Sequence, residues 1–405
     1  MNASLPKSLL AAVEMAPKDP ILGVTETFNA DSNPHKINLG VGVYYDDAGK
    51  VPLLECVRKA QHSIEEKGAP HPYLPIDGIA AYDRAVQHLV FGAESDVVKE
   101  GRAITVQALG GTGALKIGAD FLRRFLPNAQ VWISDPSWEN HRALFEGAGF
   151  TVNAYPYYDA ATHGIDFAAM TAALDQAPAG SVIVLHACCH NPTGADLSAE
   201  QWSRVIEIVR ARGQVPILDI AYQGFAEGLA EDGAIVNQFA ATPGPLFVAS
   251  SFSKSFSLYG ERVGALSVVA ASKDEAARLL SQIKRVARSN YSSPPTFGGQ
   301  VVATVLNTPE LRSLWQQELE TMRTRILANR RALVAALNAR MPGRDFAFVL
   351  RQRGMFSYSG LTLEQVKRLR SEFSVYIIDS GRICVAALNS RNLDYVADAI
   401  TKVLA

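Results

Sequence analysis

Apolar runs alternate with amphipathic stretches between residues 100 and 270 of the chain. Each apolar run predicts a strand: ITVQAL, VWI, FTVNAYPY, SVIVLHACC, VPILDIAY, LFVASSFS and RVGALSVVA. Between them, stretches such as AEQWSRVIEIVRARG carry apolar residues at helical spacing. Strands that alternate with helices indicate crossovers between parallel strands. The pattern therefore predicts an α/β fold with a mostly parallel sheet sandwiched by helices.

A different pattern begins near residue 309. Apolar residues recur three and four positions apart up to residue 340 without an internal Gly or Pro after Pro309, which predicts one long helix. Short strand-like pieces follow, then a helix over 363–373, a strand pair around 375–379 and 381–388, and a last helix. This order predicts a smaller α+β module, with the long helix as the bridge from the large domain.

Composition indicates which kinds of binding partner and which cellular compartment to expect. The chain has 39 Lys and Arg against 40 Asp and Glu, so no strongly basic face for nucleic acid or an anionic membrane is implied. None of the four cysteines has the paired spacing of a zinc site, and the adjacent Cys188 and Cys189 disfavour an ordinary disulfide. The start lacks a signal-type apolar core, and no run of about 18 apolar residues occurs. We expect a cytoplasmic protein without a membrane or nucleic-acid partner.

The stretch SSFSKSFSLYGERVG places one lysine, Lys254, just after an apolar strand. A lysine that forms an imine needs the end of a rigid strand facing a polar cavity, where its pKa is lowered. Ser251 and Arg262 flank it with a hydroxyl and a guanidinium, a pairing suited to a phosphate group. An isolated lysine in such a stretch is more often part of a solvated surface turn.

A glycine-rich turn, GGTGAL, follows the first predicted strand and opens a helix. The backbone N–H groups around Gly111 and Thr112, together with the helix dipole, suit a bound anion. The spacing differs from GxGxxG because Lys116 occupies the position of the third glycine, which argues against a dinucleotide site. Alone, the motif is as compatible with a plain tight turn.

Asp219 ends the apolar strand of VPILDIAYQGF. A buried carboxylate is costly unless it is paired, and ligands bind at the carboxyl edge of parallel sheets. Such a carboxylate can hold a protonated pyridine nitrogen, which makes the ring an electron sink. Tyr222 can donate a hydrogen bond to a phenolic oxygen of the same ring. The alternatives are an Asp that caps the next helix and a tyrosine that only packs.

Asn191 and Trp138 also follow predicted strands. Asn191 comes after the most apolar strand, and the Asn-Pro step fixes its turn. Trp138 in SDPSWENH offers a flat surface for stacking on a ring. Their alternatives are a structural Asx turn and a core tryptophan. Together, the motifs at this predicted sheet edge supply every group that a phosphorylated pyridine aldehyde needs.

The order GGTGAL, SDPSWENH, HNPTG, LDIAYQGF, SFSKSFSLYGERVG, RSNYSSPP and GRICVA resembles the class I aspartate and aromatic aminotransferases. The resemblance runs from ILGVTETF to the C-terminus and is closest to the bacterial aromatic amino-acid aminotransferases. It implies a type I fold that binds pyridoxal 5'-phosphate (PLP) and a homodimer with sites at the subunit interface. It also implies an N-terminal arm over 1–15, a large domain over 52–315, and a small domain built from 16–51 and 316–405.

The resemblance also assigns roles on the cofactor. Lys254 forms the Schiff base and moves the substrate proton, Asp219 pairs with the pyridine nitrogen, and Trp138 flanks the ring. Asn191 and Tyr222 bind the phenolic oxygen. The phosphate is held by Gly111, Thr112, Ser251 and Arg262, and by Tyr73 from the neighbouring subunit.

The resemblance assigns the substrate to a second group of residues. Arg382 grips the α-carboxylate with help from the Gly42 backbone, and Trp138 and Asn191 border the same space. Arg288 comes from the other subunit to pair with a side-chain carboxylate. No metal is implied.

Substrate choice rests on fewer residues. Arg288 favours glutamate and 2-oxoglutarate as one pair, while Tyr45, Val51 and Ser293 favour aromatic side chains by resemblance. We expect ping-pong transamination of tyrosine and phenylalanine, with aspartate also used. The alternatives are an aspartate-preferring aminotransferase and, more distantly, a β-eliminating lyase that uses PLP.

Overall fold

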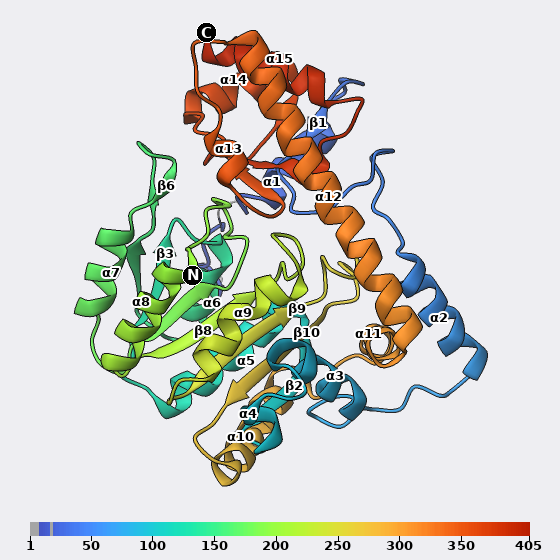
Figure 1. Cartoon of the computed structure of the whole chain (residues 1–405), viewed down its shortest axis with the longest axis vertical. Helices are drawn as coiled ribbons and strands as arrows, with labels where there is room; N and C mark the ends of the chain where they lie inside the picture. The colour runs from blue at the N-terminus through green and yellow to red at the C-terminus, as the bar shows by residue number, and fades with distance from the viewer. Residues whose placement is uncertain (1–7, 17–18) are drawn as a thin grey trace, which may run out of the picture.

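A seven-stranded sheet forms the centre of the computed structural model, which describes residues 8–16 and 19–405 (Figure 1). The strand order is β2-β10-β9-β8-β7-β3-β4. The strands are β2 (Ala103–Leu109), β3 (Val131–Asp135), β4 (Val152–Pro156), β7 (Val182–His186), β8 (Val215–Ile220), β9 (Leu246–Ser251) and β10 (Val263–Val269). Part of the predicted N-terminal arm lies outside the described residues.

The predicted mostly parallel sheet is confirmed, with one strand reversed. β4, β3, β7, β8 and β9 run parallel, whereas β10 is antiparallel to both β2 and β9. The connection from β9 to β10 contains no helix. A parallel return needs a long crossover, so this short connection turns the chain back beside β9. Lys254 and Arg262 both lie in that connection.

Successive side chains along each strand point to opposite faces of the sheet, so the interior is divided into two layers. Ile217 of β8 packs in the layer with α5, α6 and α10, whereas the next residue, Leu218, packs in the layer with α3, α7, α8 and α9. Both faces of the sheet are therefore buried, which explains why its strands read as continuous apolar runs. The helices of this body are α2 (Glu55–Lys67), α3 (Ala80–Phe91), α4 (Asp96–Lys99), α5 (Gly110–Phe125), α6 (Glu139–Gly147), α7 (Phe167–Gln176), α8 (Ala199–Ala211), α9 (Leu229–Ala240), α10 (Lys273–Tyr291) and α11 (Phe297–Asn307).

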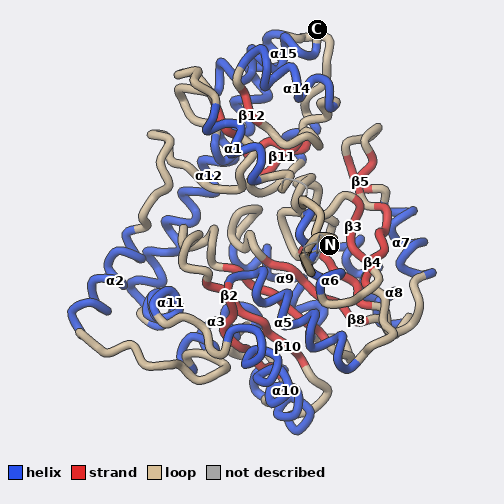
Figure 2. Tube along the Cα trace, turned by 180° about the vertical axis from the view of Figure 1, so that it is seen from behind, coloured by secondary structure: helices blue, strands red, loops and turns tan. Residues whose placement is uncertain are grey.

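The predicted long helix is α12 (Pro309–Arg340), which runs from the sheet body to a C-terminal module (Figure 1). Figure 2 shows the same arrangement from behind, with β11 and β12 in the module and the large sheet in the body below. The remaining elements are α1 (Leu22–Ala30), β1 (Ile37–Asn38), β5 (Tyr158–Asp159), β6 (Gly164–Ile165), α13 (Phe348–Arg351), β11 (Phe356–Tyr358), α14 (Leu363–Phe373), β12 (Val375–Tyr376), β13 (Arg382–Cys384) and α15 (Leu393–Leu404).

The strand pairing of this module differs from the prediction. The segments around 375–379 and 381–388 are linked by backbone hydrogen bonds, including the one from Ile378 N to Arg382 O, but form no strand ladder with each other. β12 pairs in parallel with β1, and β13 pairs antiparallel with β11, which sets Tyr358 opposite Arg382. Both partners are distant in sequence, so local pattern could not identify them. One consequence is that β1, from the N-terminal part of the chain, joins the C-terminal module.

None of the helices in the described part of the chain is long and apolar enough to span a bilayer. All four cysteines are buried and free, so Cys188 and Cys189 form no disulfide.

Candidate active site

A cavity of about 220 Å³ lies where β7, β8 and β9 end. Its walls come from the strand ends, from the start of α5 and from the C-terminal module. Among the residues predicted to hold the cofactor or the substrate, all but Tyr73 and Arg288 line it: Gly42, Gly111, Thr112, Trp138, Asn191, Asp219, Tyr222, Ser251, Lys254, Arg262 and Arg382. The residues predicted to set substrate choice, Tyr45, Val51 and Ser293, are not in its lining.

Glycines at the start of α5 let two side chains approach its first turn. Gly110 has a φ of +69°, and a Cβ there would lie 2.7 Å from Arg262 Nη2. A Cβ on Gly111 would lie 3.1 Å from the Cβ of Ser251. The first N–H groups of a helix have no partner within the helix, so they remain available to an anion. Guanidinium, hydroxyl and amide donors therefore converge on one end of the cavity.

Lys254 presents its amine to the same cavity. Its Nζ lies 5.0 Å from the centroid of the Tyr222 ring. Burial lowers the pKa of Lys254 to about 8; Asp219 opposes this shift, and the cationic Arg262 and Arg382 add to it. An ordinary lysine is almost fully protonated near neutral pH. The lowered pKa gives Lys254 a larger neutral fraction than an ordinary lysine has, and the neutral amine is the form that acts as nucleophile or base.

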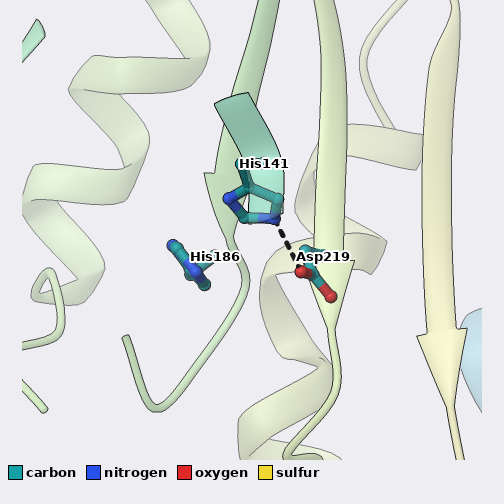
Figure 3. A group of neighbouring side chains, drawn as sticks. All are labelled: His141, His186 and Asp219. Carbon is teal, nitrogen blue, oxygen red and sulfur yellow. Dashed lines mark hydrogen bonds and ion pairs between the residues drawn. The ribbon is translucent and has the colours of Figure 1, made fainter. Parts of the chain in front are cut away.

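Asp219 is held ionised inside the protein. It is 6 % exposed, and its Oδ2 lies 2.9 Å from Nε2 of His141 (Figure 3). Burial alone would raise the pKa of Asp219, but the His141 hydrogen bond and the nearby charge of Lys254 help to bring it below its usual value. On its other side, His141 Nδ1 lies 2.9 Å from Ser137 Oγ. A buried carboxylate oriented in this way suits a cationic ligand group.

His141, His186 and Asp219 together have the composition of a metal site. One ligand-type atom from each lies within 4.8 Å of the others. However, His141 and Asp219 are already joined by a hydrogen bond, and burial lowers the pKa of His186 to about 3, so its ring is neutral. Figure 3 shows the His141 ring directed at Asp219 rather than at a shared centre. The geometry is that of a residue pair that orients a carboxylate.

Arg382 lies at the wall contributed by the C-terminal module. Its side chain is 1 % exposed and donates to Asn191 Oδ1 at 3.0 Å and to the Gly40 carbonyl at 2.6 Å. Its Cζ lies 4.3 Å from the centroid of the Phe356 ring. These partners are all uncharged, so a ligand carboxylate would supply the missing negative charge.

Tyr73 and Arg288 lie outside this cavity. Tyr73 is 94 % exposed and borders a separate surface depression with Ser292 and Ser293. Arg288 is exposed on α10 and donates to Ser292 Oγ. Both residues were expected to serve the site of a neighbouring subunit, so their roles stay predictions.

Several residues that line the cavity or contact its lining had no role in the sequence prediction. His141 stands in the quoted motif SDPSWENH, three residues after Trp138, and its spacing could have suggested that both face the same edge. Ile21 and Phe356 come from segments far from the strand ends. Their positions depend on how the C-terminal module packs against the sheet body, and no local motif carries that information.

The residues present fit PLP. The anion cradle at α5 suits its phosphate, the buried carboxylate of Asp219 suits a protonated pyridine nitrogen, and the partly neutral amine of Lys254 suits its aldehyde. Close approach to the cradle depends on the absence of a Cβ at Gly110 and Gly111. These features occur in one cavity. Without a ligand, the buried carboxylate would have no cationic ring nitrogen to pair with, and the anion cradle and the amine would have no group to bind.

Comparison with known proteins identifies the family. Residues 34–400 match the model for aminotransferases of class I and II. An aspartate aminotransferase of Pseudomonas aeruginosa is 61% identical over 98% of this chain and 100% of its own length. An aromatic-amino-acid aminotransferase of Escherichia coli is 52% identical over 95% of this chain and 98% of its own.

Solved structures agree with the sequence matches. The aromatic-amino-acid aminotransferase of Burkholderia pseudomallei, covalently bound to pyridoxal phosphate, superposes with a TM-score of 0.96 at 63% identity, over 98% of this chain and 100% of that one. The type I PLP-transferase fold and the PLP cofactor predicted from the motifs are therefore confirmed. The chain belongs to the class I and II aminotransferases and is a PLP-dependent enzyme of that family.

Proposed function

We propose that this aminotransferase exchanges amino groups between tyrosine or phenylalanine and 2-oxoglutarate, and that it also accepts aspartate. The observation that carries the proposal is the position of Arg382, a buried cation with only neutral partners at the wall of the Lys254 cavity. It can bind the α-carboxylate that all these substrates share. Amino acid and oxo acid use the same cavity in turn, so the kinetics are ping-pong.

The cavity residues divide the work of the reaction. Bound PLP supplies a ring that accepts the electron pair released when the substrate Cα–H bond breaks. With PLP bound, Lys254 Nζ would take up the Cα proton and hold it for return, while Asp219 would keep the pyridine nitrogen protonated. Trp138, Asn191 and Tyr222 line the same cavity; Trp138 would pack against the ring, and Asn191 and Tyr222 would bind its phenolic oxygen.

The phosphate anchors the cofactor through a separate set of residues. Its ligands are Gly111, Thr112, Ser251 and Arg262, with Tyr73 of the neighbouring subunit. The substrate is held by Arg382, by the Gly42 backbone and, for dicarboxylic substrates, by Arg288 from the neighbouring subunit. We thus propose a homodimer with shared sites that works in the cytoplasm.

Dual specificity is supported by the cavity wall and by the relatives. Ile21 and Phe356 give the wall apolar surface against which an aromatic ring can pack. The relatives include both aspartate and aromatic aminotransferases, and an aromatic aminotransferase of Psychrobacter sp. B6 was crystallised with aspartic acid. No described feature favours the lyase alternative.

Turnover measurements with each amino acid in turn test this proposal. Turnover of phenylalanine, tyrosine and aspartate with 2-oxoglutarate should give kcat/KM values within about a hundredfold of one another. A kcat/KM for aspartate that exceeds both aromatic values by more than this would establish the aspartate-preferring alternative. Pyruvate release from a cysteine conjugate without any oxo acid would instead support the lyase.

A further inference from the structure

Arg330 is a buried cation that the proposed reaction does not use. Its side chain on α12 is 1 % exposed, and burial lowers its pKa to about 10. Elsewhere on α12, Arg323 and Arg340 pair with Glu320 and Asp394. Arg330 makes no ion pair with any carboxylate in the described part of the chain. A buried cation without a counter-charge is costly, so other contacts must compensate for it.

Three backbone carbonyls provide that compensation, and all belong to segment 349–356. Arg330 Nη1 donates to Val349 O at 3.1 Å, and Nη2 donates to Gly354 O and Phe356 O at 2.8 Å each. Its Nε has no hydrogen-bond partner within the described structure. The planar guanidinium therefore fixes both ends of segment 349–356 against α12.

Segment 349–356 also touches the turn that carries Asn191. A Cβ on Gly194 would lie 2.8 Å from Phe356 O, and Arg353 N donates to Gly194 O at 2.7 Å. A Cβ on Gly354 would lie 2.5 Å from the Cβ of Cys189. Because these contacts are so close, a shift of segment 349–356 would displace Cys189 and Gly194, which lie on either side of Asn191.

Phe356, at the end of the segment, touches three residues of the cavity wall. Its ring centroid lies 4.3 Å from Arg382 Cζ and 5.8 Å from the Tyr222 ring. A Cβ on Gly42 would lie 2.7 Å from Phe356 Cζ. The ring thus packs against the Arg382 guanidinium, which also donates to Asn191 and Gly40.

We propose that Arg330 is a positioning residue for the substrate α-carboxylate. By holding segment 349–356, it keeps the Phe356 ring against Arg382 and keeps Arg382 in the orientation that receives the carboxylate. The inference rests on the proposed role of Arg382. A lysine could keep the charge at position 330 but could not reach three carbonyls with a planar fork.

The test uses the full-length PLP-loaded protein and its Arg330→Lys and Phe356→Leu variants. The ligand is α-methylphenylalanine, which has an α-carboxylate but no Cα proton, so a spectral titration measures Kd without turnover. Arg330→Lys should raise Kd about tenfold and raise KM for phenylalanine similarly, with kcat and the PLP spectrum nearly unchanged. Arg331→Met, which alters the exposed neighbour on α12, should leave Kd unchanged.

A double variant distinguishes an effect of Arg330 on Kd that acts through Phe356 from an independent effect of the substitution on the fold. If Arg330 acts through Phe356, Arg330→Lys in the Phe356→Leu background should add little to Kd. An Arg330→Lys protein that unfolds cooperatively yet keeps the wild-type Kd would overturn the proposal, as would additive effects in the double variant. Wild-type turnover reports separately on the proposed function, because the inference depends only on the ratio of variant to wild-type Kd.

Discussion

At the scale of single residues, the site depends on two ionisable groups whose pKa values are both lowered, one because of burial and the other despite it. Lys254 follows burial and loses its proton more readily, whereas Asp219 resists burial because His141 and the nearby cations favour its charged form. The sequence could identify both residues from their positions at strand ends. It could not show the His141 contact, because α6 and β8 are distant in sequence.

The lowered pKa of Lys254 predicts how the apoenzyme captures PLP. Only the neutral amine attacks an aldehyde, so the capture rate should rise about tenfold per pH unit below pH 8 and level off above it. Stopped-flow absorbance on apoenzyme measures this rate. A rate that keeps rising towards pH 10.5, the value of an ordinary lysine, would show that burial does not shift the group.

His141 should control the acid limb of the activity profile. Its hydrogen bond helps to lower the pKa of Asp219 in the folded protein, so His141→Leu should raise that pKa and let the carboxylate protonate at higher pH. The acid limb of kcat/KM then moves to higher pH, and activity falls more at pH 6 than at pH 8. The exposed His62→Leu on α2 is the control, and its profile should match that of the wild type.

At the scale of secondary-structure elements, the sequence anticipated the elements better than their pairing. Continuous apolar runs predicted the parallel strands, because strands buried on both faces have no polar alternation. The β1–β12 and β11–β13 pairs escaped prediction, since each joins residues far apart in sequence. The reversal of β10 also escaped prediction, although the short connection from β9 could have indicated it. The reversed strand has a consequence for the site, because the β9–β10 connection carries Lys254 and Arg262.

The glycine at the start of α5 should be necessary for phosphate binding. Gly110→Ala adds a Cβ at positive φ and 2.7 Å from Arg262 Nη2, so Arg262 must move and the affinity for PLP should fall at least about tenfold. Fluorescence titration of apoenzyme with PLP measures the change. Gly118→Ala on the same helix meets only Leu266 at 3.6 Å and should bind PLP as the wild type does. Equal affinities for the two variants would contradict the assignment.

At the scale of the whole molecule, the cavity joins parts that are remote in the sequence. The sheet body supplies Lys254 and Asp219, whereas Arg382 comes from beyond α12, in the module to which β1 also belongs (Figure 1). We propose that residues 52–315 form one domain and that 16–51 and 316–405 form the other. Arrangement at this scale could be predicted only by resemblance, because no local pattern reports which module faces the sheet edge.

The proposed sharing of sites between subunits predicts complementation. Lys254→Ala and Arg288→Ala subunits should each turn over aspartate poorly, and each hybrid dimer should contain one site with both residues intact. Unfolding and refolding an equal mixture should restore about a quarter of wild-type activity with aspartate. If Arg288 acts within its own subunit, the mixture should stay as inactive as its components. Sedimentation of the wild type checks the dimer independently.

The half-reaction with one amino acid tests the central claim most directly. PLP-loaded protein given excess phenylalanine without any 2-oxo acid should release one phenylpyruvate per site and then stop, with a change in cofactor absorbance and no ammonia. The Lys254→Ala protein should release almost none on the same timescale. Continued product release without an acceptor, or a wild-type rate in Lys254→Ala, would contradict amino-group transfer by Lys254 in this cavity.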